Sequence, residues 1–399
     1  MLLGTARALI TPPLGVHLAG YGFERKATEV LDELELGAFW FQDEEPDGTS
    51  VCIITADIIG FSASLTTALR AELAERFGIA PQAVLLAASH THSGPQTCEN
   101  MATAGGPPDP GSVVALRRRL MEAAAAARGA LRPVNLRVGR GCLQGYAINR
   151  RLMMNGVAVM APNPEGVRDD EVLVVTCHDR RDDRVRAVLF HYTCHPTLMG
   201  DHRITGDYPG AARRHVEKEL DGVCVGFLPG CFGDVRPDCV LVGRKAFRRA
   251  IPEDVAAFGA ALGAEVVRVA RAATSSAPLH PRLSAHAATI ELPLQKEPER
   301  VPLSVQRLDL AEELTLIALG GEICVDYGRF IKSTRAPGFM IPVGYANGMI
   351  GYICPARQFA EGGYEPDTSH AVFNLPSPFQ PAIEGIIHEA IQDLAQRRF

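Results

Sequence analysis

Blocks of consecutive apolar residues, separated by segments of helical periodicity, constrain the fold of this 399-residue chain most strongly. The apolar residues of these blocks do not alternate with polar ones, which is typical of strands that are covered on both faces. The blocks lie at 51–60, 83–88, 134–139, 171–177, 184–192, 223–228 and 314–320. Helical patterns lie at 62–78, 112–130, 208–222, 252–273 and 381–398. The alternation predicts an α/β fold with a mixed, largely buried β-sheet flanked by helices on both faces.

The sequence contains no repeat, low-complexity linker or shift in composition that would mark a domain boundary. We therefore expect a single domain over residues 1–399. Two Gly/Pro-rich pieces, 104–111 and 333–346, are predicted to be long loops within that domain.

The composition narrows the classes of function. Hydrophobic residues make up 47% and charged residues 22%, which is ordinary for a soluble globular protein. A net charge of −6 argues against nucleic-acid binding, and no apolar run approaches the ~18 residues of a membrane span. The N-terminus does not resemble a secretory signal, and the ten cysteines form no CxxC pair, so a cytoplasmic location is expected. A homo-oligomer is compatible with the sequence.

Polar side chains follow four of the predicted strands. In open α/β sheets, ligands bind beyond the carboxyl ends of strands, so these side chains are expected to converge. They are His90 and His92 in SHTHSGP, His195 and Asp207 in CHPTLMGDHRITGD, Asp234 and Arg236 in GDVRP, and Glu322 in GGE.

Each of these residues also has a plain structural interpretation. A lone histidine can be a hydrogen-bonded loop residue, Glu322 can cap a helix, and Arg236 can form a surface ion pair. Two histidines and a carboxylate from separate strands are, however, typical of a catalytic zinc ion with an open position for water. Such a site hydrolyses amides or esters with metal-activated water. The chain has no HExxH, GxSxG or Walker A motif.

The order of several motifs resembles the neutral (non-lysosomal) ceramidase family. These motifs are ITPPLGVHLAGYG, ITADIIG, SHTHSGP, HPTLMG, ITGDYPG, GDVRP, GGE and ANGMIGYICP. The resemblance extends from about residue 3 to about residue 370 and covers the catalytic domain of that family.

The resemblance implies a zinc amidase with its site at matching positions. The metal ligands would be His90, His195, Glu322 and Tyr352, with Tyr345 and Tyr364 close to the last in sequence. His92 and Arg150 would face the substrate carbonyl or its oxyanion. Asp207 and Asp234 would support the site by orienting its ligands.

Two departures from the family pattern affect the expected substrate. Arg236 stands where ceramidases carry a serine, and its guanidinium is suited to a carboxylate, a phosphate or the oxyanion. The sequence also ends after one C-terminal helix, without the additional β-sandwich domain of that family. A small soluble amide is therefore expected in place of a membrane lipid.

The main hypothesis is a zinc-dependent hydrolase that cleaves an amide bond of a small substrate. A metal-dependent esterase or lactonase would use the same residues. A thiol enzyme that uses Cys231 or Cys194, and a binding protein without catalytic activity, are the alternatives from other classes.

Overall fold

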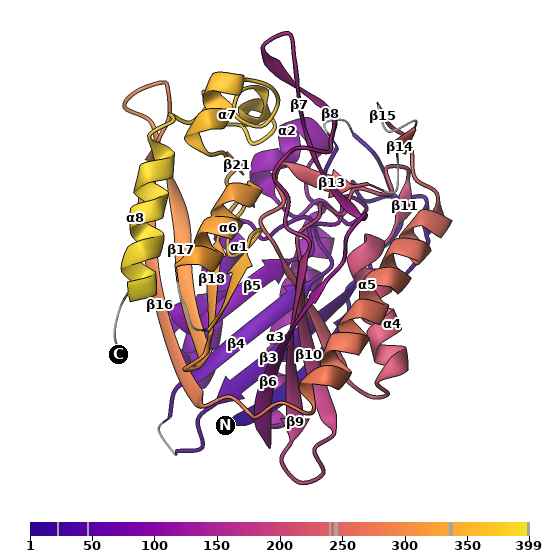
Figure 1. Cartoon of the computed structure of the whole chain (residues 1–399), viewed down its shortest axis with the longest axis vertical. Helices are drawn as coiled ribbons and strands as arrows, with labels where there is room; N and C mark the ends of the chain where they lie inside the picture. The colour runs from indigo at the N-terminus through magenta and orange to yellow at the C-terminus, as the bar shows by residue number, and fades with distance from the viewer. Residues whose placement is uncertain (22–23, 46–47, 239–240, 243–245, 335–337, 397–399) are drawn as a thin grey trace.

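Two β-sheets form the centre of the computed structural model, which describes residues 1–21, 24–45, 48–238, 241–242, 246–334 and 338–396 (Figure 1). In spatial order, the eight-stranded sheet consists of β12 (Cys224–Pro229), β10 (Val185–Tyr192), β9 (Glu171–Asp179), β6 (Arg132–Cys142), β1 (Leu2–Leu9), β3 (Glu35–Gln42), β4 (Ser50–Ala56) and β5 (Val84–Ala88). The four-stranded sheet consists of β16 (Pro281–Pro293), β17 (Arg300–Ala311), β18 (Leu314–Leu319) and β20 (Phe339–Val343).

Helices cover the outer faces of the sheets. Figure 1 shows α4 and α5 along one flank and α8 along the other. The longer helices are α1 (Ala63–Phe77), α3 (Pro110–Gly129), α4 (Asp207–Glu219), α5 (Pro252–Ala273), α6 (Val325–Ser333) and α8 (Ile383–Gln396). Helix α3 packs on β1 and β3, α5 packs on β6 and β9, and α8 packs on β16 and β17.

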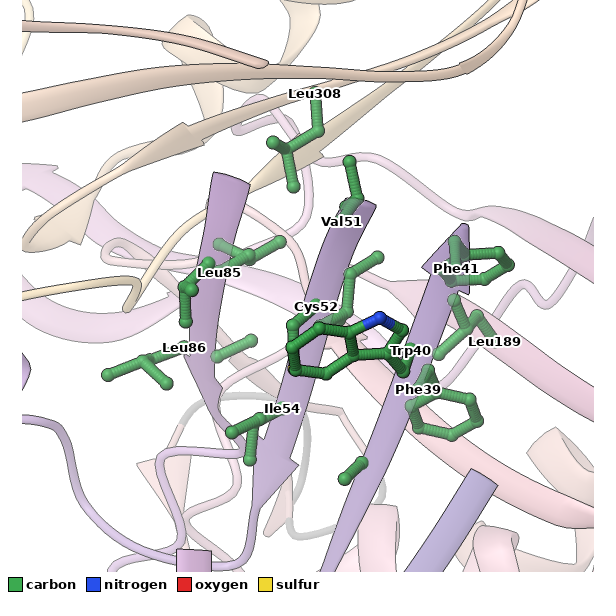
Figure 2. Close-up of a cluster of buried hydrophobic side chains, with 14 of the residues drawn as sticks. Phe39, Trp40, Phe41, Val51, Cys52, Ile54, Leu85, Leu86, Leu189 and Leu308 are labelled. Atoms are coloured by element: carbon green, nitrogen blue, oxygen red, sulfur yellow. The ribbon is translucent and has the colours of Figure 1, made fainter. Parts of the chain in front are cut away.

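The two ends of the eight-stranded sheet pack against each other. Side chains of β3 alternate, so that Trp40 contacts Phe77 of α1 with ring centroids 5.7 Å apart, whereas Phe39 points to the opposite face. There the Phe39 ring lies against Gly226 of β12, where a Cβ atom would be only 2.7 Å from the ring. Figure 2 shows Phe39, Phe41 and Leu189 together in this apolar interior. The sheet therefore folds over its own buried core.

Three parallel strand pairs position the functional loops. In each pair a helix connects the two strands: α1 lies between β4 and β5, α4 between β10 and β12, and α6 between β18 and β20. Parallel strands end at the same edge, so the loops after their carboxyl ends meet there.

The predicted fold class is confirmed, and each of the seven predicted strands and five predicted helices is present. The prediction of a loop over 333–346 was wrong, because β20 lies within it and pairs in parallel with β18; residues 335–337 lie outside the described part. The loop predicted over 104–111 also contains the start of α3. Within the described residues, none of the helices has the length and apolarity needed to span a bilayer.

Candidate metal centre

His90 and His195 lie just beyond the carboxyl ends of β5 and β10, respectively, and both are fully buried. The Nδ1 atom of His90 donates to the carbonyl oxygen of Ile59 at 2.6 Å, and that of His195 donates to the carbonyl oxygen of Phe232 at 3.0 Å. Because a carbonyl oxygen only accepts, each imidazole carries its proton on Nδ1. Each Nε2 therefore presents a lone pair, as is usual for metal-binding histidines.

The carboxylate of Glu322 lies between these two lone pairs. Its Oε2 atom is 3.6 Å from Nε2 of His90 and 3.5 Å from Nε2 of His195. Both Glu322 Oε2 and His195 Nε2 are buried without a hydrogen-bond partner. Unpaired buried polar atoms are costly and uncommon, so a cation bound among them fits this arrangement.

His92 belongs to the same cluster. Its Nε2 atom is 3.2 Å from Nε2 of His90, and the donor atoms of His90, His92 and His195 all lie within 4.8 Å of one another. This buried group could hold a metal ion. Burial, followed by the neighbouring His90 and nearby guanidinium groups, holds the pKa of His92 well below its usual value, which favours the neutral imidazole.

The loop that contains Gly20 and Tyr21 packs on His92. The Tyr21 ring meets the His92 ring edge-on at 5.0 Å, and a Cβ atom on Gly20 would lie 2.3 Å from Cγ of His92. Arg25 donates to the carbonyl oxygen of His92 at 2.7 Å. These contacts fix the orientation of the imidazole, and only glycine fits at position 20.

Tyr352 comes to the site through a short parallel strand pair. Strand β19 (Glu322–Ile323) pairs with β21 (Tyr352–Ile353), and the register places Glu322 beside Tyr352. Arg150, on β7 (Ala147–Met154), donates to the Tyr352 hydroxyl at 3.0 Å. Burial raises the pKa of Tyr352 well above its usual value, and the positive charge of Arg150 opposes that shift.

Glu365 is a site residue that the sequence analysis missed. Its carboxylate accepts from Nε of Arg150 at 2.7 Å and from Arg151 at 2.5 Å, and all three side chains are buried. A glutamate in a segment without regular periodicity gives no signal in a single sequence. Its role is to orient Arg150 and to balance part of the local positive charge.

Asp207 and Asp234 hold loops in place, and no hydrogen bond joins either to the described histidines. Asp207 accepts from the backbone N–H groups of Leu198 and Met199, in the loop after His195. Asp234 accepts from the N–H of Val325 at 2.9 Å, at the start of α6. Asp234 also accepts from the side chains of Asn149 and Gln358, so it holds side chains as well as backbone in place.

Comparison with known proteins identifies the family. The family model described as neutral/alkaline non-lysosomal ceramidase, N-terminal, matches residues 1–262. The chain belongs to this family. The resemblance inferred from the motifs is thereby confirmed. Membership makes the chain a hydrolase, and amide hydrolysis is the reaction that the family and fold imply.

Solved structures agree on the fold. Neutral ceramidase from Pseudomonas aeruginosa superposes with a TM-score of 0.82 at 17% identity, covering 99% of this chain and 74% of that one. A ceramidase complexed with C2 gives a TM-score of 0.83 at the same identity and coverage. None of the curated proteins matches the sequence.

Arg236 is not the surface ion pair that its plain interpretation suggested. It lies on β13 (Val235–Pro237), and its guanidinium carbon is 4.0 Å from the ring centroid of Phe247. Among the described residues no carboxylate pairs with it, and its Nε atom is buried without a partner. In this ceramidase-family chain, Arg236 therefore follows Val235, whose carbonyl oxygen accepts from the backbone N–H of His195 at 3.1 Å, and no described carboxylate neutralises its charge.

The two cysteines considered as nucleophiles are buried. Burial raises the pKa of the Cys231 thiol, and no described imidazole is hydrogen-bonded to it. The thiol of Cys194 lies 3.9 Å from the carbonyl oxygen of Tyr146. A reactive thiol needs a lowered pKa and access, so Cys231 is poorly suited to that role.

Proposed function

We propose that the chain is a zinc-dependent hydrolase of amide bonds in small substrates, with His90, His195, Glu322 and Tyr352 as metal ligands. One observation carries this proposal: the Nε2 atoms of both histidines lie within 3.6 Å of the same carboxylate oxygen. Their Nδ1 atoms are hydrogen-bonded to backbone carbonyls, and Nε2 of His195 has no other hydrogen-bond partner, whereas Nε2 of His90 also lies 3.2 Å from Nε2 of His92.

The donor set suits zinc. Imidazole nitrogen and carboxylate oxygen are common zinc ligands, and a catalytic zinc site leaves a coordination position open. When bound, zinc supplies Lewis acidity, lowers the pKa of water and polarises a carbonyl group. Calcium and magnesium prefer shells composed of oxygen atoms, so the two imidazoles argue against them.

Arg150 and His92 have separate tasks in this proposal. Arg150 is held by Glu365 and directs a guanidinium N–H toward the Tyr352 hydroxyl, so its charge is fixed where negative charge develops on the substrate carbonyl oxygen. The lowered pKa of His92 favours its neutral form and Tyr21, Gly20 and Arg25 fix its position, so its imidazole can exchange a proton with a substrate oxygen.

Tyr345 is the alternative tyrosine. Its ring centroid lies 4.2 Å from that of His90, and its hydroxyl is buried without a hydrogen-bond partner. We favour Tyr352 because it pairs in register with Glu322 and its hydroxyl accepts a hydrogen bond from Arg150.

The test compares matched amide, ester and lactone substrates before and after chelation. Amide hydrolysis that is lost with a chelator and restored by zinc supports the proposal. Hydrolysis of esters or lactones alone would assign the chain to the alternative metal-dependent class. Activity that resists chelation but is abolished by alkylation of Cys231 or Cys194 would contradict the proposed mechanism.

Three further predictions accompany this function. We propose that residues 1–399 act as one domain, because His90 and His195 follow strands of the larger sheet whereas Glu322 follows a strand of the smaller one. The cytoplasmic location and the homo-oligomer stay predictions.

A further inference from the structure

Arg236 and Arg150 lie on neighbouring strands near the proposed metal centre. In the antiparallel pair of β13 and β7, Arg236 is opposite Ile148, and Arg150 follows Ile148 by two residues. Alternation along a strand places Ile148 and Arg150 on the same face, so the two arginines are diagonal neighbours. The backbone N–H of His195 donates to the carbonyl oxygen of Val235, the residue before Arg236, at 3.1 Å, which places the backbone of Arg236 beside the histidine cluster.

The two guanidinium groups differ in their partners. Arg150 is neutralised by Glu365 and hydrogen-bonded to Tyr352. Arg236 has no ion pair with a carboxylate in the described part of the chain, and its Nε–H is buried and unused. A polar atom buried without a hydrogen-bond partner is costly, so the position of this Nε–H is explained more readily by a ligand than by stability.

The ring of Phe247 holds Arg236 in a defined orientation. The guanidinium carbon lies 4.0 Å from the ring centroid, which is within the range of a cation–π contact, and such a contact occupies none of the N–H donors. Arg236 is partly exposed, whereas His92 is 6% exposed, so Arg236 is the more accessible of the two to a ligand from solvent.

We propose that Arg236 binds a carboxylate carried by the substrate, so that the chain hydrolyses amides of anionic compounds such as N-acyl amino acids. This inference rests on the proposed amide hydrolase function and specifies its substrate class. The planar fork of a guanidinium matches a carboxylate through two parallel hydrogen bonds. One unneutralised arginine balances a single negative charge, which favours a carboxylate over a phosphate dianion.

The first experiment measures kcat/KM of the zinc-loaded protein for N-acylglycines and for the matching N-acylglycinamides, which lack the negative charge. We expect the acids to be preferred by more than about 10-fold. Arg236→Gln should lower kcat/KM for the acids by about 10- to 100-fold, as expected for loss of a charged hydrogen-bonded pair. The same variant should lower the value for the amides by a smaller factor, so that the preference for the acids falls below about 3-fold.

Arg236→Lys is the matched variant, because it keeps the positive charge and removes the planar guanidinium group that donates two parallel hydrogen bonds. We expect it to retain a preference for the acids, smaller than that of the parent. Equal turnover of acids and amides by the parent, or an unchanged preference in Arg236→Gln, would overturn the inference while leaving the amide hydrolase function intact. A preference for a phosphorylated amide over the acid would also overturn it.

A second readout does not require turnover. Calorimetry with N-octylsulfonylglycine and its primary amide measures binding directly, because in both compounds a sulfonamide S–N bond replaces the acyl amide bond that the protein would cleave. The parent should bind the acid at least about 10-fold more tightly than the amide, and Arg236→Gln should bind both equally. If no amide is hydrolysed under any condition, the proposed function fails, and this binding difference still decides the role of Arg236.

Discussion

Glu322 and Tyr352 lie side by side because β19 and β21 form a parallel pair in which these two residues are in register. The pair continues through Ile323 and Ile353, and the Sγ atoms of Cys324 and Cys354 follow at 3.8 Å. Two distant chain segments are thus joined at the point where the proposed metal ligands are needed. The backbone pairing places Tyr352 beside Glu322, and the hydrogen bond from Arg150 fixes the Tyr352 hydroxyl.

The first prediction concerns Glu322. We expect Glu322→Gln to lower zinc affinity by more than about 100-fold, because removal of a partner that only orients a ligand already costs 10- to 100-fold. Titration with a fluorescent zinc chelator measures this affinity. Glu72→Gln is the control, because Glu72 pairs with Arg117 at the surface and should leave zinc affinity unchanged. Equal zinc affinity in the two variants would exclude Glu322 as a ligand.

The second prediction separates the two tyrosines. Tyr352→Phe should weaken zinc binding and lower kcat by at least about 10-fold, since it removes the hydroxyl that Arg150 contacts. Tyr345→Phe removes a hydroxyl that has no hydrogen-bond partner and should preserve both properties. Metal analysis and initial rates on the same preparations give the comparison. The reverse pattern would assign the ligand to Tyr345.

The third prediction tests the support of His92. Gly20→Ala would place a methyl group 2.3 Å from Cγ of His92 at a backbone φ of +97°, so the imidazole must move. We expect kcat/KM to fall by more than about 10-fold. Gly15→Ala imposes a similar φ of +92° with no atom within 4 Å, and it isolates the backbone strain. A similar loss of activity in both variants would show that strain alone is responsible.

The fourth prediction concerns pH and stability. Burial, reinforced by the charge of Lys332, lowers the pKa of His191 to about 3. In the unfolded chain this imidazole binds a proton as the pH falls through about 6.5, whereas in the folded protein it stays unprotonated until a lower pH. The contribution of the buried His191 to the unfolding free energy is therefore fully present above pH 6.5. It is lost as the pH falls toward 3, by up to about 1.4 kcal/mol per pH unit.

Chemical unfolding of the parent and of His191→Gln between pH 8 and pH 4 measures this contribution. Below pH 6.5 the unfolding free energy of the variant should fall less steeply with decreasing pH than that of the parent. The difference in slope should correspond to about one proton. The two curves should run parallel between pH 7 and pH 8, which serves as the internal control. Parallel curves over the whole range would contradict the assignment to His191.

The strands that sequence reasoning found are those with continuous apolar blocks. Strand β5, for example, is fully buried and reads VLLAA. Strand β16 was missed because its central residues alternate in exposure and include His286 and Glu291, so they lack such a block. Strand β20 was hidden by the neighbouring Gly and Pro residues, although Met340 and Ile341 are buried against β18.

The site was predictable where ligand candidates follow recognisable strands. His90, His195 and Glu322 do so, and the structure brings them together. Glu365 was not predictable, because its partners Arg150 and Arg151 are distant in sequence and only the fold joins them. The backbone roles of Asp207 and Asp234 likewise depend on which N–H groups the loops present.

Metal content tests the central claim most directly. Elemental analysis of the purified protein and of a His90→Ala/His195→Ala variant should be combined with amide hydrolysis before and after chelation. The account predicts about one zinc ion per chain in the parent, none in the variant, and activity that follows the zinc content. A parent protein that neither contains nor binds zinc, yet hydrolyses amides, would contradict it.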